Sequence, residues 1–254
     1  ILATDSNSID AVKLIAKSFL VIRKIDDARL YFDKALTIKP DDYEVIKDLG
    51  NIFLALGDIN NAKNYYRKAI EINNSYAPAL SNLGGIELNS GNKQEALSLL
   101  IKATAYGPKL DAAWANLTTA YLHLGKPQEA ENSCREAIRN NPNLFNSHFL
   151  LGTILLGNKK LKEAEQPFRK AIELKPDFAE AHSNLGNILI DLGDLQEAEQ
   201  SLRKTIELKP DFAEAHSNIG IILKDLGKLQ DAEISTRKAI ELNPNLFNSH
   251  FLLG

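Results

Sequence analysis

Residues 179–212 read AEAHSNLGNILIDLGDLQEAEQSLRKTIELKPDF, and this stretch decides the fold. In its first half, one stripe advances in helical steps of three or one residues instead of alternating as in a strand: Ala179, His182, Leu185, Gly186 and Leu189. The pattern breaks at Gly193, where one helix is expected to stop before the next begins. The second half places Leu195 and Leu202 on one side, and Pro210 closes the stretch because proline cannot continue a helix. The stretch therefore predicts two helices joined by a short turn.

The same pattern recurs every 34 residues along the chain. Prolines end successive stretches in this register: Pro40, Pro108, Pro142, Pro176, Pro210 and Pro244. Alanines keep the same period: Ala28, Ala62, Ala96, Ala130, Ala164, Ala198 and Ala232. A fixed period of this size indicates a stacked repeat array, in which each helix pair buries its apolar face against its neighbours. We therefore predict an all-α fold of antiparallel helix pairs.

The period divides the chain into seven complete units: 9–42, 43–76, 77–110, 111–144, 145–178, 179–212 and 213–246. Residues 1–8 are interpreted as the remnant of a preceding helix, and residues 247–254 as the start of an eighth unit. Because the chain begins with Ile1 and contains no methionine, we expect it to be a segment of a longer protein. Glycines such as Gly186 should let the two helices of a unit approach closely, while one larger residue of each unit fills the core: Phe32, Tyr66, Leu100, Cys134, Phe168 and Leu202.

The composition excludes several classes of protein. The 254 residues carry 30 Lys+Arg against 33 Asp+Glu, and this near-neutral balance argues against a nucleic-acid-binding protein. One cysteine excludes a disulfide framework and a cysteine-rich zinc module. No apolar stretch approaches the roughly 20 residues that a membrane-spanning helix needs. We expect a cytoplasmic protein that binds neither nucleic acid nor membranes.

The spacing of key residues resembles that of the tetratricopeptide repeat (TPR) family. Its consensus, W-x2-L-G-x2-Y, then A-x3-F, then P, is matched most fully by Trp114, Leu117, Tyr121, Ala130 and Pro142. In that unit Thr118 replaces the glycine and Cys134 replaces the phenylalanine. The resemblance covers residues 9–254 and implies a right-handed superhelix of helix pairs. It also implies that the first helices line a concave groove that binds a peptide or a protein partner.

Asparagines occupy one position of the first helix in four units: Asn82, Asn116, Asn184 and Asn218. An asparagine amide both donates and accepts hydrogen bonds, so such a ladder can hold a peptide backbone irrespective of its side chains. The arrangement resembles the asparagine ladder in the TPR region of O-linked N-acetylglucosamine transferases. Asn187 lies on the same predicted face. The alternative is that these amides solvate the groove or form hydrogen bonds between units.

Two further features of this face suggest binding. Leu150 interrupts the ladder beside Phe149, which predicts either an apolar hot spot or a contact between repeats. Lys47, Asn51 and Asn82 match three positions of the carboxylate clamp of chaperone-cofactor TPR domains. The two remaining clamp positions, basic in those domains, are Ala112 and Asn116, so a carboxylate should bind weakly.

No catalytic or metal-binding chemistry is predicted. Four histidines are 34 residues apart, but equivalent side chains in stacked repeats are about 8–10 Å apart and cannot share one metal ion: His148, His182, His216 and His250. We therefore expect buried structural histidines, a core role for Cys134, no cofactor and no enzymatic activity. The acidic residues are interpreted as solvated helix faces paired with Lys or Arg.

One residue breaks the helical rules. Pro167 falls inside the predicted second helix of unit 145–178, where an interior proline costs about 3 kcal/mol. We expect either a bend at this point or a late helix start.

Three functions remain open. The first is a scaffold that binds an extended peptide or partner segment in the groove. The second is the substrate-recruiting arm of a larger enzyme whose catalytic domain lies elsewhere in the full-length protein. The third is self-assembly through uncapped end repeats, which would expose unfinished core.

Overall fold

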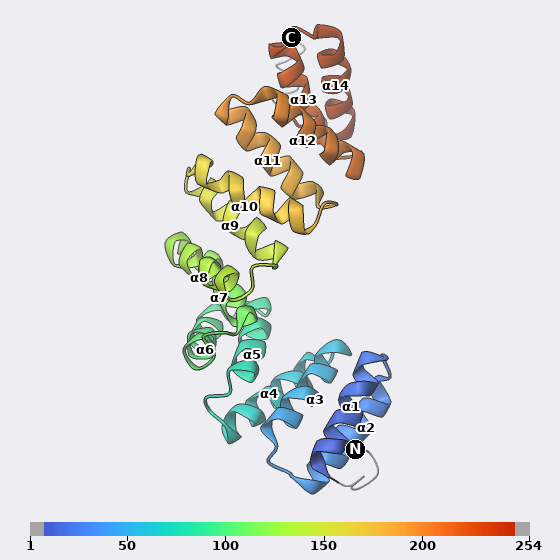
Figure 1. Cartoon of the computed structure of the whole chain (residues 1–254), viewed down its shortest axis with the longest axis vertical. Helices are drawn as coiled ribbons and strands as arrows, with labels where there is room; N and C mark the ends of the chain where they lie inside the picture. The colour runs from blue at the N-terminus through green and yellow to red at the C-terminus, as the bar shows by residue number, and fades with distance from the viewer. Residues whose placement is uncertain (1–7, 247–254) are drawn as a thin grey trace. The chain divides into compact units, whose positions relative to one another are not determined.

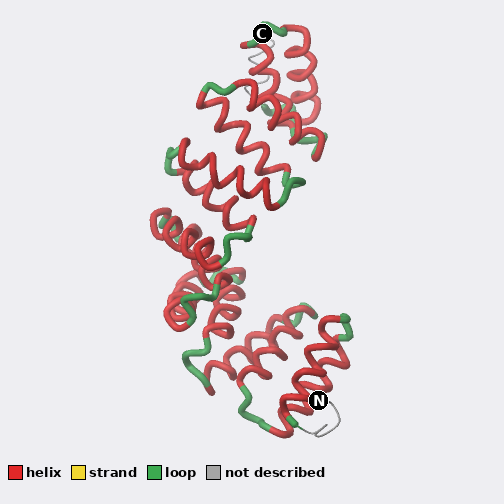
Figure 2. The backbone as a smooth tube through the Cα atoms, in the orientation of Figure 1, coloured by secondary structure: helices red, strands yellow, loops and turns green. Residues whose placement is uncertain are grey.

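The computed structural model describes residues 8–246, in which every regular element is an α-helix (Figures 1 and 2). The helices of the described range are α1 (Ile9–Val21), α2 (Ile25–Ile38), α3 (Tyr43–Ala55), α4 (Ile59–Ile72), α5 (Ala77–Asn89), α6 (Lys93–Tyr106), α7 (Asp111–His123), α8 (Pro127–Asn140), α9 (Phe145–Gly157), α10 (Leu161–Leu174), α11 (Ala179–Leu192), α12 (Leu195–Leu208), α13 (Ala213–Asp225) and α14 (Leu229–Leu242). The predicted all-α fold of successive helix pairs is confirmed.

The chain forms two compact units, one ending at Asn140 and the other beginning at Asn141. The first unit contains α1–α8 and the second contains α9–α14. Within each unit, consecutive helices pack as pairs, and the second helix of a pair also packs on the first helix of the next pair. The interpretations of residues 1–7 and 247–254 lie outside the described range, while Ser8 is the N-cap of α1.

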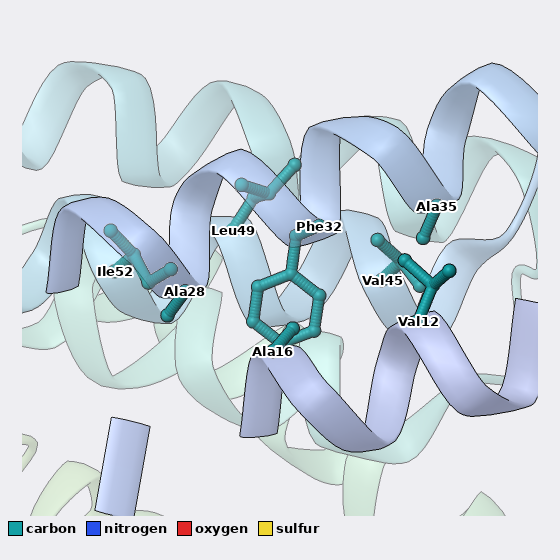
Figure 3. Close-up of a cluster of buried hydrophobic side chains, with 8 residues drawn as sticks. All are labelled: Val12, Ala16, Ala28, Phe32, Ala35, Val45, Leu49 and Ile52. Atoms are coloured by element: carbon teal, nitrogen blue, oxygen red, sulfur yellow. The ribbon is translucent and has the colours of Figure 1, made fainter. Parts of the chain in front are cut away.

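The apolar core runs between neighbouring pairs. Figure 3 shows one cluster, in which the Phe32 ring of α2 lies between side chains of α1 and α3. The buried members of this cluster are Val12, Ala16, Ala28, Phe32, Ala35, Val45, Leu49 and Ile52. Helix α3 therefore completes a core that the α1–α2 pair cannot close alone.

The predicted close approach at the glycines is confirmed. A β-carbon on Gly186 would lie 2.7 Å from Cγ of Leu202, and one on Gly152 would lie 2.8 Å from Cε2 of Phe168. These distances are below van der Waals contact, so the large side chain of the second helix occupies the space where a first-helix side chain would stand.

Pro167 does not delay the start of its helix. Helix α10 begins at Leu161, in line with the second helices of the other pairs, and Pro167 lies within it. The expectation of a late start is therefore wrong. The alanines flanking the proline, Ala164 and Ala171, are fully buried, so packing against the neighbouring helices holds the segment in place.

The turn inside each pair needs a left-handed residue. Glycine supplies it in most described pairs, with φ between +67° at Gly125 and +85° at Gly193, but Arg23 and Lys159 adopt φ of 59° and 60° at the equivalent positions. This conformation costs an L-residue about 1–2 kcal/mol, whereas glycine adopts it freely.

Lys159→Gly should therefore raise the free energy of unfolding by about 0.5–1 kcal/mol, because the relief of strain exceeds the entropy that glycine gains in the unfolded chain. Thermal and urea unfolding of the full chain would measure the change. Lys162→Gly, in the first turn of α10, is the matched control and should destabilise the chain, since its position is helical. An equal loss in both variants would contradict the prediction.

Candidate functional site

One position on the first helices recurs every 34 residues, and in each of the two compact units the side chains at this position form a surface that we call the ladder face. It is held by Leu14 (α1), Asp48 (α3), Asn82 (α5) and Asn116 (α7) in the first unit, and by Leu150 (α9), Asn184 (α11) and Asn218 (α13) in the second. Leu14 is exposed, Asp48 is buried, and the other five side chains are half-buried. The four asparagines therefore keep partial access to solvent.

Two ladder asparagines form amide pairs with the preceding repeat. Asn82 Nδ2 donates to Asn51 Oδ1 at 2.9 Å, and Asn218 Nδ2 donates to Asn187 Oδ1 at 2.6 Å. Asn51 Oδ1 also accepts from the hydroxyl of Tyr66 at 2.8 Å. Burial raises the pKa of Tyr66 to about 12, so this hydroxyl stays protonated and donates. At these positions the amides bond between repeats, which is the alternative that the sequence left open.

The other two ladder asparagines lack an amide partner, because the residue 31 positions earlier is Gly85 for Asn116 and Thr153 for Asn184. Asn116 Nδ2 makes only long contacts to Ser81, at 3.4 Å to its carbonyl oxygen and 3.5 Å to its hydroxyl. Within residues 8–246, the Asn184 side chain makes no hydrogen bond. Asn116 and Asn184 are therefore the two ladder asparagines whose amides make no hydrogen bond shorter than 3.4 Å within residues 8–246.

Asp48 carries a charged version of the amide pair. Its Oδ2 atom lies 4.0 Å from Nζ of Lys17, which is 31 residues earlier, and its Oδ1 atom accepts a short hydrogen bond from Lys47. Asp48 Oδ2 itself is buried and accepts no hydrogen bond in the described part of the chain. Lys47 is therefore neutralised by a neighbouring carboxylate, which weakens the case for a carboxylate clamp at Lys47, Asn51 and Asn82.

Phe149 is part of an aromatic cluster within the repeat 145–178. Its ring centroid lies 5.6 Å from that of Phe168 in α10 and 4.7 Å from that of Phe178, the N-cap residue of α11. The Lys175 ammonium covers this cluster, 4.8 Å from the centroid of Phe145 and 5.3 Å from that of Phe178. Phe168, Phe178 and Lys175 all belong to the same repeat as Phe149, so these contacts decide neither of the two predicted roles, an apolar hot spot or a contact between repeats. Leu150 beside Phe149 is half-buried.

The interpretation of all acidic residues as solvated is wrong for several of them, most clearly for Glu87. This side chain is fully buried and accepts hydrogen bonds from Lys63 Nζ at 2.9 Å, Arg67 Nη2 at 3.0 Å and Asn92 Nδ2 at 2.7 Å. Burial acts to raise the pKa of Glu87, but the hydrogen bonds from Asn92 and Lys63 outweigh it and hold the pKa below its usual value. The buried carboxylate therefore joins α4 to α5.

Asp42 links α1 to α3 in a similar way. It caps α3 by accepting from the backbone N–H groups of Glu44 and Val45, both at 3.1 Å, and it pairs with Lys13 Nζ at 3.1 Å. Burial opposes ionisation, yet the Val45 N–H and the Lys13 ammonium keep the pKa of Asp42 lowered. Glu87 and Asp42 therefore both connect a helix of one repeat to a helix of the next.

The histidines hold the starts of the first helices. His148, His182 and His216 each place Nε2 at 2.9–3.0 Å from a proline carbonyl oxygen six residues earlier, and Trp114 Nε1 donates to Pro108 in the same way. The rings are half-buried, less enclosed than the sequence suggested, but their role is structural. His250 lies outside the described residues. Residues 8–246 contain no group of three side chains placed to bind a metal ion.

A search of the described helices for membrane-spanning candidates finds none of sufficient length and apolarity.

The family model of the cilia and flagella-associated protein 70 C-terminal domain, a TPR family, matches residues 28–245. Among solved structures, the chain is similar to YrrB, described as a TPR protein with an unusual peptide-binding site, at 24% identity and a TM-score of 0.69 over 73% of this chain and 96% of YrrB. PilF of Pseudomonas aeruginosa matches at 21% identity and a TM-score of 0.73, over 80% of this chain and 92% of PilF.

The Cut9–Hcn1 tetramer of the APC/C also matches, at 18% identity and a TM-score of 0.66, over 100% of this chain and 50% of the matched chain. No curated protein matches the sequence. The likenesses to solved structures show the fold, helix pairs packed in sequence as in a TPR superhelix. The family match covers most of the chain, so the chain belongs to the TPR family described as cilia and flagella-associated protein 70 C-terminal domain.

Proposed function

We propose that this chain is a non-catalytic scaffold whose ladder face binds an extended segment of a partner protein. The observation that carries the proposal is the pair of incompletely bonded amides, Asn116 in the first unit and Asn184 in the second. A half-buried amide can donate to a peptide carbonyl and accept from a peptide N–H at little cost in ordering, because the helix already holds it.

The two amide pairs between repeats support this role indirectly. Asn51 with Asn82, and Asn187 with Asn218, tie neighbouring first helices together and keep the ladder face rigid. A rigid surface loses little entropy when an extended peptide binds, so many weak contacts can add up to useful affinity. Phe149 and Leu150 supply apolar surface in the second unit, where a hydrophobic side chain of the peptide could pack.

The partner is proposed to be a protein or peptide, and not a nucleic acid or a membrane, since the chain has a net charge of only −3. A cytoplasmic location fits a chain whose one cysteine, Cys134, is buried and takes part in no disulfide. The name of the family directs the search for partners to cilia and flagella.

Asn116→Ala and Asn184→Ala should each weaken peptide binding by about threefold to tenfold, the value of one or two hydrogen bonds. The test selects peptides from a displayed random library on the wild-type chain and measures their dissociation constants by titration. Asn64→Ala removes an exposed amide from the second helix α4 and serves as the matched control, with no expected change.

Two results would contradict the proposal. One is that no peptide is selected. The other is that the selected peptides bind the Asn116→Ala and Asn184→Ala variants as tightly as the wild type, which would move the binding surface away from the ladder face. Circular dichroism of the variants separates loss of binding from loss of fold.

A further inference from the structure

A ladder side chain that bonds to the preceding repeat bonds to the residue 31 positions earlier, which we call its partner position. Three pairs of the described residues follow this register: Asn51 with Asn82, Asn187 with Asn218 and, in charged form at 4.0 Å, Lys17 with Asp48. The partner position lies on the preceding first helix, three residues after that helix's own ladder position. Its side chain therefore decides whether the next ladder residue is paired.

Gly85 occupies the partner position of Asn116 and offers it no side chain. A β-carbon at Gly85 would lie 3.2 Å from Nδ2 of Asn116, so the amide lies where a side chain of residue 85 would begin. The Nδ2 end of Asn116 makes only the two long contacts to Ser81. Its Oδ1 atom accepts no hydrogen bond within residues 8–246. Glycine thus leaves the carbonyl end of this amide free and the amino end weakly held.

Thr153 occupies the partner position of Asn184, and its hydroxyl bonds elsewhere. Thr153 Oγ1 donates to the carbonyl oxygen of Phe149, in its own helix, at 3.0 Å. A hydroxyl has one proton to donate, so that proton is used within α9. The Asn184 side chain makes no hydrogen bond in the described part of the chain. Two different residues, glycine and threonine, therefore have the same effect, an unpaired ladder amide.

An unpaired amide fits one kind of occupant. It can donate to a carbonyl oxygen and accept from an N–H group at the same time. An extended segment presents both groups, whereas a helix uses them for its own backbone hydrogen bonds. A paired amide such as Asn82 has its Nδ2 end held by the preceding helix, and turning it towards a ligand would cost about 0.5–1.5 kcal/mol. The unpaired amides therefore favour an extended segment.

We propose that Gly85 and Thr153 are specificity-determining residues of the ladder face. Each leaves the ladder asparagine of the next repeat unpaired, so that Asn116 and Asn184 bind the backbone of an extended partner segment. This inference rests on the proposed function and adds that binding at each asparagine is controlled from the preceding repeat. With asparagine at the partner position, the ladder amide bonds between repeats instead, as in the two observed amide pairs.

Gly85→Asn and Thr153→Asn install the partner residue of the observed amide pairs. Peptides selected on the wild-type chain should bind Gly85→Asn about threefold to tenfold more weakly, as they bind Asn116→Ala. Thr153→Asn should have the effect of Asn184→Ala. Both substitutions introduce a residue that already stands at this position in α3 and α11, so the fold should be kept.

A double variant separates pairing from obstruction of the peptide. If Gly85→Asn acts by pairing, it should weaken binding no further once Asn116 is replaced by alanine, whereas a side chain that obstructs the peptide would add to the loss. Thr119→Asn is the matched control. It places an asparagine at the same position of α7, but the residue 31 positions later is Leu150, which has no amide. Its affinity should stay at the wild-type value.

The reverse substitution should make a further amide available. Asn187→Thr installs the residue found at Thr153, and Asn218 then loses its partner. Peptides selected on the Asn187→Thr chain should lose affinity by about threefold to tenfold when Asn218→Ala is added. Equal binding with and without Asn218→Ala would contradict control by the partner position.

Side-chain amide exchange, measured by NMR on the chain without peptide, tests the pairing alone. The amide protons of Asn116 should exchange with water more slowly in Gly85→Asn than in the wild type, and those of Asn184 more slowly in Thr153→Asn. Unchanged exchange in both variants would overturn the inference.

The peptide measurements distinguish this inference from the proposed function. Peptides that lose affinity on Asn116→Ala and Asn184→Ala, but bind Gly85→Asn and Thr153→Asn like the wild type, would overturn the inference and leave the proposed function standing. Peptides that bind all four variants like the wild type would overturn both.

Discussion

Glu87→Ala is expected to lower the free energy of unfolding by about 2–3 kcal/mol. The substitution removes a fully buried carboxylate that accepts hydrogen bonds from Lys63, Arg67 and Asn92. Breaking a buried ion pair by removing one partner costs about 3–5 kcal/mol when the other charge stays buried. The expected loss is smaller because the Arg67 side chain is 47% exposed and can turn to water.

Glu87→Gln separates charge from shape, since it keeps the size of the side chain and loses the carboxylate. Its loss should be smaller than that of Glu87→Ala, and urea unfolding of both variants measures the difference. Glu95→Ala is the control: Glu95 is exposed and lies 3.7 Å from the same Arg67, so its removal should change stability by less than about 0.5 kcal/mol. Equal effects at Glu87 and Glu95 would show that the buried network contributes nothing special.

Acid should remove the same contribution. Because the pKa of Glu87 is lowered in the folded chain, the carboxylate stabilises the fold above its unfolded pKa, and this stabilisation is lost as the pH falls through the folded pKa. The wild type should therefore lose more stability than Glu87→Gln as the pH falls below the ordinary glutamate value. Asp42 and Glu197, whose pKa values are also lowered, titrate in both proteins and cancel in the comparison.

The fold could be predicted because the repeat encodes it many times. Each 34-residue repeat specifies the same helix pair by its small residues, its large core residue and its closing proline. An exception such as Asn74 at a proline position therefore leaves the helix pair intact. Pro167 departs from prediction for a related reason. A local rule places a helix start after it, but the buried neighbours Ala164 and Ala171 hold that segment helical from Leu161.

The ladder was only half predictable, because its hydrogen bonds depend on residues in two different repeats. The sequence of one 34-residue repeat contains the asparagine, but whether it has a partner depends on the residue 31 positions earlier. That residue is Asn51 for Asn82, which forms the pair, and Gly85 for Asn116, which cannot. Glu87 could have been found in the same way. It occupies a position at which other 34-residue repeats carry Phe53, Tyr121 or Leu155. A comparison of the repeats therefore predicts that the charge of Glu87 is buried.

The second large effect is expected at the contact between Gly152 and Phe168. Phe168 is fully buried, and its ring occupies the space where a Gly152 side chain would stand. Phe168→Cys should cost about 3 kcal/mol, because it leaves a cavity in a close-packed core. Gly152→Thr should cost about 1–3 kcal/mol, because the new side chain meets the ring.

The chain itself contains the combination of both changes. In unit 111–144 the equivalent residues are Thr118 and Cys134, which are 0% and 1% exposed. There the first helix carries Thr118 in place of glycine, and the second helix carries the smaller Cys134 in place of phenylalanine. The hydroxyl of Thr118 donates to the carbonyl oxygen of Trp114 at 2.9 Å. A larger side chain at the first position is therefore accompanied by a smaller one at the second.

Combining Gly152→Thr with Phe168→Cys should thus cost less than the sum of the single losses, with a favourable coupling of about 1–2 kcal/mol. Urea unfolding of the four proteins in the cycle measures this coupling, and hydrogen exchange in α9 and α10 locates it. Gly152→Thr with Arg203→Ala, a distant exposed site in α12, is the control and should be additive. Additive losses in the Gly152–Phe168 cycle would contradict the prediction. They would mean that the side-chain sizes at these two positions are independent of each other.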